Sequence, residues 1–196
     1  MTEKKPPLVA AIEGSPRPGG NTDLLMDAAC QGAVERGANV VRFRLNDLNI
    51  RPCQGCGGCD KTGVCVIKDD MGLIYDALEN MDSIILGSPI YFGGVTAQTK
   101  AMIDRCQPYW VRKYLLKTPI YNDNRRRDMV FVSVLAQDKA DEIECTRVNV
   151  HYFMDVISMD GDLTELIFPR VEHAGEIGDH WEALGQAREA GAKLVP

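Results

Sequence analysis

The sequence predicts an α/β fold in which helices cover both faces of a doubly wound, parallel sheet of five strands. Short apolar segments alternate along the chain with segments whose apolar residues recur at helical spacing, a pattern typical of such a sheet. A loop rich in glycine and proline directly follows the first apolar segment, and ligands in doubly wound folds bind at the C-terminal ends of the strands. The length of 196 residues suits one domain with a sizeable core, so we expect a single domain over residues 1–196.

Five short apolar runs are expected to form the strands. Leu8–Ile12 is a continuous run that leads into the glycine-rich loop, whereas apolar and basic residues alternate in Asn39–Leu45, which predicts a strand with one solvent-exposed face. Ser83–Gly87 is again a continuous apolar run, as expected of a buried parallel strand. The remaining strands are predicted at Met129–Leu135 and within Asp162–Phe168.

A helix is predicted after each strand. The first, at about 22–36, has apolar residues at helical spacing and is followed by Gly37, a residue type that commonly ends helices. The second, at about 69–80, starts with a pair of aspartates, whose charge suits a helix N-terminus. The other helices are expected at about 96–109, 140–157 and 181–193.

Composition and charge narrow the classes of function. Hydrophobic residues make up 45% of the chain and charged residues 26%, the balance of a globular rather than a disordered protein. The net charge of −6 opposes a general nucleic-acid role, because phosphate contacts need a basic face. No apolar run approaches the roughly 18 residues of a membrane span, and the polar N-terminal tail does not resemble a secretory signal. We therefore expect a cytoplasmic protein without a membrane or nucleic-acid partner.

The loop Gly14–Thr22 has the composition of a phosphate-binding site. Gly14 lets the backbone turn sharply after a buried strand, and hydroxyl, amide and guanidinium side chains follow it. The next helix is expected to begin at the end of this loop, so that its free N–H groups point at the same place. The loop matches neither a Walker loop nor a dinucleotide motif, and the alternative is an ordinary turn with a helix cap. The residues expected to bind the phosphate are Ser15, Arg17, Gly20, Asn21 and Thr22.

Three segments resemble one known family. Gly-Ser-Pro-Arg-x-x-Gly-Asn-Thr at 14–22 resembles the phosphate loop of the NAD(P)H-dependent FMN reductase and iron–sulfur flavoprotein family. Residues 88–100 resemble the second flavin loop of that family, and Ala-Met-Ile-Asp-Arg at 101–105 resembles the helix after it. The resemblance covers most of the chain up to about residue 140. It implies a flavodoxin-like fold with strand order 2-1-3-4-5, FMN as cofactor, and flavin sites at the subunit interfaces of a homodimer or homotetramer.

The segment after the third strand is expected to contact the flavin ring. An isoalloxazine ring needs flat apolar contacts on its face and backbone donors at its edge, which aromatic side chains and glycines can provide. The alternative is a plain turn with its aromatic residues in the core. The expected contacts are Pro89, Ile90, Tyr91, Phe92, Gly93 and Gly94. A third contact is expected from the loop after the fourth strand, near Ala136 and Gln137.

Four of the seven cysteines crowd into a segment after the second strand, at about 46–68, which we interpret as an insertion. The spacing Cys53-x2-Cys56-x2-Cys59-x5-Cys65 begins like a ferredoxin motif, and thiolates are the usual ligands of iron–sulfur clusters. The spacing also resembles the compact motif of iron–sulfur flavoproteins, and this resemblance implies a [4Fe–4S] cluster. Nearby glycines allow the tight winding that would let four sulfurs converge; they are Gly55, Gly57, Gly58 and Gly63.

Three alternatives to the cluster stay open. A structural zinc site would use four thiolates, although usually in two separated pairs. A Cys-x-x-Cys dithiol would need only two of the four, and the cysteines could also be reduced and unligated. Cys30, Cys106 and Cys145 lie on expected helices and are interpreted as core residues. The basic residues of 111–127 could bind a nucleotide phosphate or an acidic partner, but an irregular solvated loop is the simpler interpretation.

The function that follows is that of an FMN-dependent oxidoreductase. Electrons would pass between FMN and a donor, either ferredoxin or NAD(P)H, with the cluster as a one-electron relay and a small molecule as acceptor. No catalytic acid or base is assigned, because the cofactor itself reacts. The alternatives are an FMN-dependent dehydrogenase of a small organic substrate in one pathway, and a non-catalytic electron carrier of the flavodoxin type.

Overall fold

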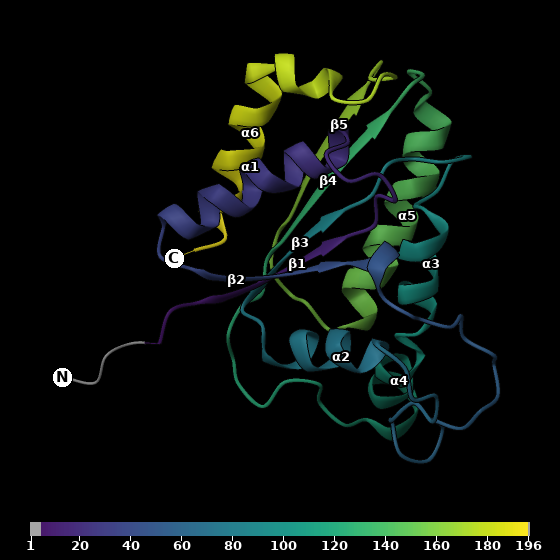
Figure 1. Cartoon of the computed structure of the whole chain (residues 1–196). Helices are drawn as coiled ribbons and strands as arrows, with labels where there is room; N and C mark the ends of the chain where they lie inside the picture. The colour runs from purple at the N-terminus through teal and green to yellow at the C-terminus, as the bar shows by residue number, and fades with distance from the viewer. Residues whose placement is uncertain (1–4, 196) are drawn as a thin grey trace.

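The central sheet of the protein has five parallel strands in the order β2-β1-β3-β4-β5. The computed structural model describes residues 5–195 and is shown in Figure 1. The strands are β1 (Leu8–Glu13), β2 (Asn39–Arg44), β3 (Ser83–Gly87), β4 (Met129–Leu135) and β5 (Leu163–Pro169). The order reverses between β1 and β3, as the sequence predicted, and this reversal marks the edge of the sheet where a ligand is expected.

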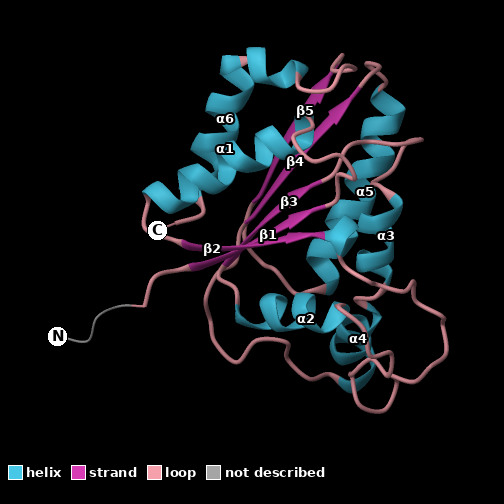
Figure 2. Ribbon diagram, viewed as in Figure 1, coloured by secondary structure: helices cyan, strands magenta, loops and turns pink. Residues whose placement is uncertain are grey.

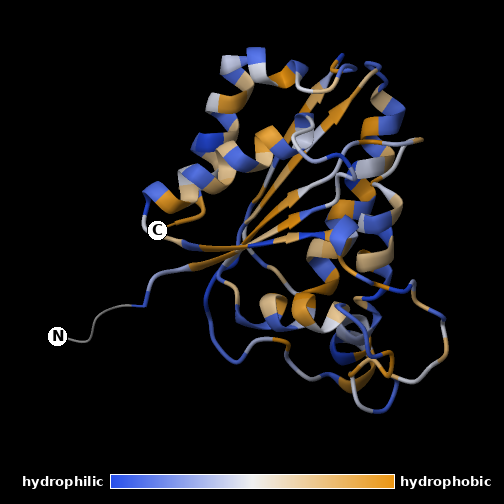
Figure 3. Ribbon diagram, in the orientation of Figure 1, coloured by the Kyte–Doolittle hydropathy of each residue, from blue (hydrophilic) through white to orange (hydrophobic). Residues whose placement is uncertain are grey.

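Helices cover both faces of the sheet (Figure 2). One face is covered by α1 (Asn21–Glu35) and α6 (Trp181–Lys193). The other is covered by α2 (Met71–Asn80), α3 (Ala97–Asp104) and α5 (Ala140–Val156), with the short α4 (Gln107–Trp110) below them. Each side has its own apolar core. Figure 3 shows the hydrophobic residues concentrated on the strands between the two helical layers, which is the layered arrangement that the sequence predicted.

Close packing of α1 on α6 fixes the position of α1. A side-chain carbon on Gly32 would overlap the backbone of Arg188, and one on Gly191 would overlap the backbone of Ala29. Both glycines are therefore required by the near contact of the two helices. Because α1 is held in this way and follows β1 directly, its N-terminus is presented at the C-terminal end of β1.

The helix expected at 96–109 is interrupted. The structure ends α3 at Asp104 and begins α4 at Gln107. The physical reason is Pro108, which has no N–H to donate to the carbonyl of Asp104 and therefore cannot continue a helix through this point. The region expected to be irregular at 111–127 begins with a π-helical turn, η2 (Val111–Leu116), which ends at Lys117 in the left-handed region with φ of 54°.

The cysteine segment is an insertion between β2 and α2, as expected. After the short 3-10 turn η1 (Leu45–Asp47), residues 48–70 form neither helix nor strand. The segment makes a wide loop beside α4 (Figure 1), and most of its side chains are exposed. No helix in residues 5–195 is long and apolar enough to cross a membrane.

Candidate functional site

The loops after β1 and β3 are joined at Gly14. The Gly14 N–H donates to the carbonyl of Gly87 at 2.7 Å, and its carbonyl accepts from the Thr96 hydroxyl at 2.7 Å. A side-chain carbon on Gly14 would overlap the Thr99 hydroxyl, so only glycine fits here. Thr96 also caps α3 by accepting from the Thr99 N–H. The two predicted flavin loops are thus held side by side as one unit.

A cavity of about 260 Å³ lies where these two loops meet. It opens at the C-terminal ends of β1, β3, β4 and β5, the edge at which doubly wound folds bind ligands. The predicted residues on its wall are Ser15, Arg17, Gly20, Asn21, Thr22, Pro89, Ile90 and Tyr91. Of the two residues expected to provide a third contact, Ala136 lies on this wall together with Val134 and Leu135, and Gln137 does not.

The loop after β5 completes this wall. It is the short connection to η3 (Glu176–Asp179), and it contributes Val171, Glu172 and Ala174 to the cavity. The resemblance to the family is weak beyond about residue 140, so the sequence did not indicate this contribution. The general rule that all parallel strands end at the same edge could have found it.

The phosphate loop has the geometry of an anion site. The Ser15 hydroxyl accepts from the Arg17 N–H at 3.3 Å, and the Gly20 N–H donates to the Arg17 carbonyl at 3.2 Å. These bonds wind the loop so that α1 starts at Asn21, next to the cavity. The first N–H groups of a helix have no partner within it, and together with the helix dipole they attract an anion. The exposed Arg17 side chain lies at the rim, where it could pair with a phosphate.

The Asn21 side chain has a partner that the sequence did not indicate. Its amide N–H donates to the His173 carbonyl at 2.8 Å, and its oxygen accepts from the Ile177 N–H at 3.1 Å. Asn21 therefore fastens the loop after β5 to the start of α1. Its backbone N–H is the group that the geometry offers to a ligand, and a role for its side chain at the phosphate stays a prediction.

A buried cluster of charges lies behind the phosphate loop. Glu13, which is fully buried, pairs with Arg42 at 2.9 Å and with Arg44 at 2.7 Å. Asp23 pairs with both arginines and accepts the Gly19 N–H at 2.6 Å. The alternating pattern of β2 predicted a solvent-exposed face, and Val41 and Arg42 are exposed. Arg42 and Arg44 nevertheless reach the two carboxylates. They neutralise charge that would otherwise repel a bound phosphate.

The pKa values of the two carboxylates in this cluster are shifted in opposite directions. Burial raises the pKa of Glu13 above its usual value, and the pairing with Arg42 only partly offsets this. Burial also opposes ionisation of Asp23, but the Gly19 N–H and the two arginines outweigh it and lower the pKa of Asp23 overall. Asp23 therefore stays ionised at neutral pH and keeps Gly19 in place, in a left-handed conformation with φ of 67°.

Only half of the second predicted loop reaches the cavity. Backbone bonds between Tyr91 and Gly94 at 2.9 and 3.1 Å close a tight turn, and Phe92 at its tip is fully exposed in a left-handed conformation with φ of 52°. Gly93 and Gly94 are likewise not on the cavity wall. The structure therefore does not place Phe92 in the core, and it does not bring Phe92, Gly93 or Gly94 to the wall as it does Tyr91.

All four clustered cysteines face one cavity, of about 360 Å³. Its wall includes Cys53, Cys56, Cys59 and Cys65. Three glycines of this loop adopt left-handed conformations and supply the tight winding expected from the sequence; they are Gly55, Gly57 and Gly63. Burial raises the pKa of the Cys59 thiol, and the charge of Asp60 raises it further.

A cluster and a single metal ion would use these four thiols differently. Tetrahedral zinc would need its thiolates drawn close around one ion. In a [4Fe–4S] cluster each thiolate binds a different iron, so the sulfurs stand farther apart around a larger body. All four cysteines are free thiols, and a shared cavity with glycine-rich walls fits such a body.

The three remaining cysteines differ from one another. Cys106 is buried and Cys30 is partly buried against the core, as expected of packing residues. The prediction for Cys145 was wrong, because it is exposed on α5. Its position on the outer side of a helix that covers the sheet explains the difference.

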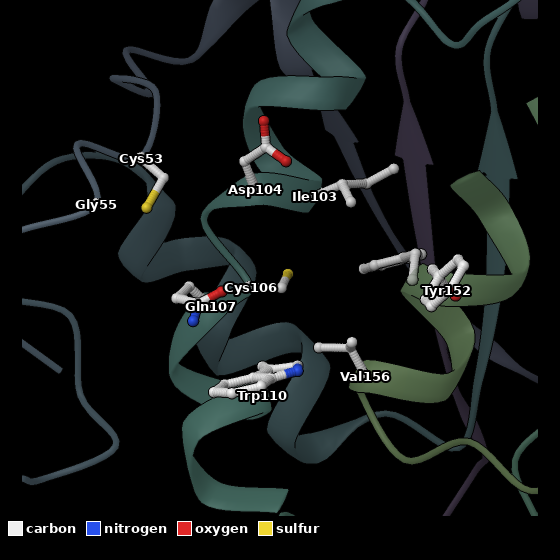
Figure 4. A pocket seen from close by; sticks show the side chains of 10 residues that line it. Cys53, Gly55, Ile103, Asp104, Cys106, Gln107, Trp110, Tyr152 and Val156 are labelled. Carbon is white, nitrogen blue, oxygen red and sulfur yellow. The ribbon is translucent and has the colours of Figure 1, made fainter. Parts of the chain in front are cut away.

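A second hollow adjoins the cysteine loop. It has a volume of about 430 Å³ and lies between the cysteine loop, the α3–α4 junction and α5. Figure 4 shows Cys53 on one side, Tyr152 and Val156 on the other, and Cys106 and Trp110 between them. Cys53 and Gly55 line both this hollow and the cysteine cavity, so a molecule bound here would lie beside the thiols.

The basic residues before β4 are occupied by acidic neighbours. Arg127 is buried, stacks on the Tyr121 ring at 3.6 Å and pairs with Asp123 at 2.9 Å. Arg125 pairs with Asp123 and Asp82, and Arg126 with Asp128 and Asp162. They precede β4 and therefore lie at the opposite edge of the sheet from the cavity at the phosphate loop. The structure thus favours a structural role for this run over binding of a nucleotide phosphate.

Comparison with known proteins places this geometry in context. The family model described as NADPH-dependent FMN reductase matches residues 7–136. An iron–sulfur flavoprotein of Methanocaldococcus jannaschii is 46% identical over 100 residues, which cover 51% of this chain and 52% of that protein. One of Methanosarcina thermophila is 36% identical over 112 residues, covering 57% and 59%. The match thus spans about half the length of these relatives.

Solved structures share the fold. An NAD(P)H:quinone oxidoreductase from Methanothermobacter marburgensis superimposes with a TM-score of 0.76 at 16% identity, covering 96% of both chains. A flavone reductase superimposes with a TM-score of 0.71 at 21% identity, covering 95% of this chain and 61% of its own. At these identities the likeness extends to the fold alone.

Proposed function

Because the chain belongs to the NADPH-dependent FMN reductase family of oxidoreductases, we propose that its bound FMN exchanges electrons with an NAD(P)H or ferredoxin donor, with a [4Fe–4S] cluster as a one-electron relay, and passes them to a small-molecule acceptor. The observation that carries this proposal is the presence of two cavities, each lined by one set of predicted cofactor-binding residues. One is lined by both predicted flavin loops, and the other by all four clustered cysteines. NAD(P)H is the donor that the family implies, and ferredoxin is the alternative donor.

The flavin cavity offers a distinct group to each part of FMN. The first-turn N–H groups of α1 and the Arg17 guanidinium would hold the phosphate, and the Ser15 hydroxyl, which also braces the loop, lies on the same wall. Pro89, Ile90 and Tyr91 would pack along the ring. When bound, FMN supplies the redox chemistry by accepting a hydride or single electrons. The residues of the chain then serve to bind and orient it.

The cysteine cavity would hold the cluster. Cys53, Cys56, Cys59 and Cys65 would each provide one thiolate. Names of the relatives support this assignment, since seven of them are described as iron–sulfur flavoproteins. A cluster passes one electron at a time, so it would suit exchange with a one-electron carrier.

A homodimer or homotetramer belongs to the same proposal. Tyr91, on the wall of the flavin cavity, is 43% exposed, and the neighbouring Phe92 is fully exposed. Aromatic residues left open beside a ligand cavity are suited to contact with a second subunit. Light scattering of the FMN-loaded protein should give a mass of two or four chains.

A second candidate function is favoured by the hollow beside Cys53. Its volume of about 430 Å³ is within the usual range for small-molecule sites, and Trp110 and Tyr152 offer aromatic surface (Figure 4). This supports an FMN-dependent dehydrogenase acting on a small organic substrate. A defined organic product formed with stoichiometric flavin reduction would select this alternative.

Anaerobic purification tests the proposal most directly. We expect a flavin spectrum corresponding to about one FMN per chain, with about four iron and four sulfide. Cys56→Ser should lose the iron and keep the FMN, whereas the control Cys30→Ser, outside the cysteine cavity, should keep both. Failure to bind FMN would refute the whole proposal, and iron near zero would refute the relay alone. Steady-state reduction of the bound FMN by NAD(P)H would indicate a reductase. In an electron carrier, only a protein donor would reduce the FMN.

A further inference from the structure

Arg105 is a buried cation on the wall of the cysteine cavity. It follows the last residue of α3, and only 1% of its surface is exposed. The cavity wall includes its side chain along with the four cysteines. A buried guanidinium is costly unless its donors are paired, so the partners of each nitrogen indicate what this residue does.

Two of the three guanidinium nitrogens close the ends of the cysteine loop. Nη1 donates to the Arg51 carbonyl at 2.8 Å and to the Asp69 carboxylate at 2.7 Å. Nη2 donates to the other Asp69 oxygen at 3.0 Å and to the Ile67 carbonyl at 3.5 Å. Arg51 precedes the first cysteine of the loop and Ile67 follows the last. One side chain therefore ties together the entry and the exit of the segment that carries all four thiols.

Asp69 strengthens this closure from the other side. Its carboxylate also accepts the Arg51 N–H at 3.0 Å and the Met71 N–H at 3.2 Å. Burial alone would raise the pKa of Asp69, but the Arg105 hydrogen bond and the backbone donors lower it overall. The carboxylate is therefore ionised, and the two charges form a bidentate, buried pair.

The third nitrogen of Arg105 has no partner. Its Nε–H is buried and makes no hydrogen bond. An unpaired buried donor costs about 1–3 kcal/mol, and the other nitrogens show that this guanidinium is otherwise fully used. The Tyr75 hydroxyl lies close to this guanidinium, but it donates its own proton to the Arg105 carbonyl. Arg105 also lines the cavity with the four cysteines, so a sulfur atom bound there would offer an acceptor within the same site.

We propose that Arg105 positions and tunes the cluster: its Asp69 pair closes the cysteine loop, and its Nε–H donates a hydrogen bond to a cluster sulfur. This inference rests on the cluster of the proposed function. Arg105 would keep its proton when the cluster takes up an electron, because a guanidinium does not deprotonate in proteins. A fixed positive charge and a donor to sulfur stabilise the more negative, reduced cluster and raise its reduction potential.

The central test compares Arg105→Lys with Arg188→Lys. Lysine keeps the charge but cannot reproduce the fork that joins Arg51, Asp69 and a sulfur. We expect EPR-monitored titration to show a reduction equilibrium at least tenfold less favourable, about 59 mV for one electron, with unchanged FMN content. Arg188 is a matched control, because it is exposed on α6 and pairs with Glu35, and its variant should keep the wild-type potential.

A second measurement needs no variant. Wild-type protein labelled with 15N-arginine should show hyperfine coupling between an arginine nitrogen and the reduced cluster, and Arg105 is the arginine on the cavity wall. A cluster-containing wild type without that coupling, or an unchanged potential in Arg105→Lys, would overturn the role of Arg105 and leave the relay standing. A wild type purified without iron would overturn both together, so the two failures are distinguishable.

Discussion

The two cofactor loops of this protein are held in different ways. The phosphate loop lies between β1 and α1, is braced by β3 and α3 through Gly14, and is backed by a buried charge cluster. The cysteine loop has no helix or strand over 48–70, is mostly exposed, and is fastened at its two ends by Arg105 and Asp69. The fold thus builds the first site before any ligand binds, whereas the second should take its final shape with its ligand.

Gly14→Ala should have the largest effect on the preformed site. An added carbon would overlap the Thr99 hydroxyl, which is itself bonded to Thr96, so β1 and α3 would have to separate. Overpacking of this kind costs about 1–3 kcal/mol. Thermal unfolding should therefore show a midpoint lowered by roughly 2–10 °C, and FMN titration should show weakened binding.

Gly185→Ala is the control for this substitution. Gly185 lies within α6 with no atom within 4 Å of an added carbon, so alanine should be neutral or stabilise the helix by up to about 1 kcal/mol. If Gly14→Ala bound FMN as tightly as the wild type, the connection of the two loops at Gly14 would not be needed for the site.

Asp23→Asn should weaken phosphate binding specifically. The variant weakens the bond that holds Gly19 in the phosphate loop, and we expect this loss of loop geometry to outweigh the removal of a negative charge that Arg42 and Arg44 already neutralise. We expect about tenfold weaker binding of FMN, corresponding to about 1.4 kcal/mol, and unchanged binding of riboflavin, which lacks the phosphate. Equal losses for the two ligands would contradict a role at the phosphate. Asp27→Asn is the control, because Asp27 is exposed and contacts only Arg42 of the two arginines.

The same variant has a defined pH dependence. Since the pKa of Asp23 is lowered from its usual 3.8, the folded state favours the ionised carboxylate. Its contribution to the free energy of unfolding is fully present above pH 3.8 and is lost as the pH falls through the lower pKa of the folded state. Denaturant unfolding of Asp23→Asn and of the wild type should therefore differ most near neutral pH and converge in acid.

The sequence indicated features that depend on local pattern. Alternating segments predicted the sheet, the family resemblance implied its strand order, and the glycine-rich loop predicted the α1 N-terminus at the cavity. Pro108 could have indicated the break between α3 and α4, but the helical periodicity of the segment led to the prediction of one continuous helix. The pairing of Arg105 with Asp69 joins residues 36 apart, and that of Asn21 with His173 residues 152 apart. No local pattern carries such contacts, because they depend on where the fold brings distant segments together.

Gly55→Ala should have the smallest effect on folding and should act on the other loop. Gly55 has φ of 58° with open space around it, so alanine would be strained in its backbone without any clash, at a cost of about 1–2 kcal/mol. The loop contributes little to the core, so the strain should be relieved locally while the unfolding midpoint stays unchanged. The cost would appear when a cluster requires that winding. A chelator should then remove iron from the variant about fivefold or more faster than from the wild type.

Gly175→Ala is the matched control, since Gly175 is also left-handed and open but lies outside the cysteine loop, and it should retain iron like the wild type. If Gly55→Ala instead lowered the unfolding midpoint or FMN affinity, the cysteine loop would be part of the preformed fold, and the contrast between the two sites would be wrong.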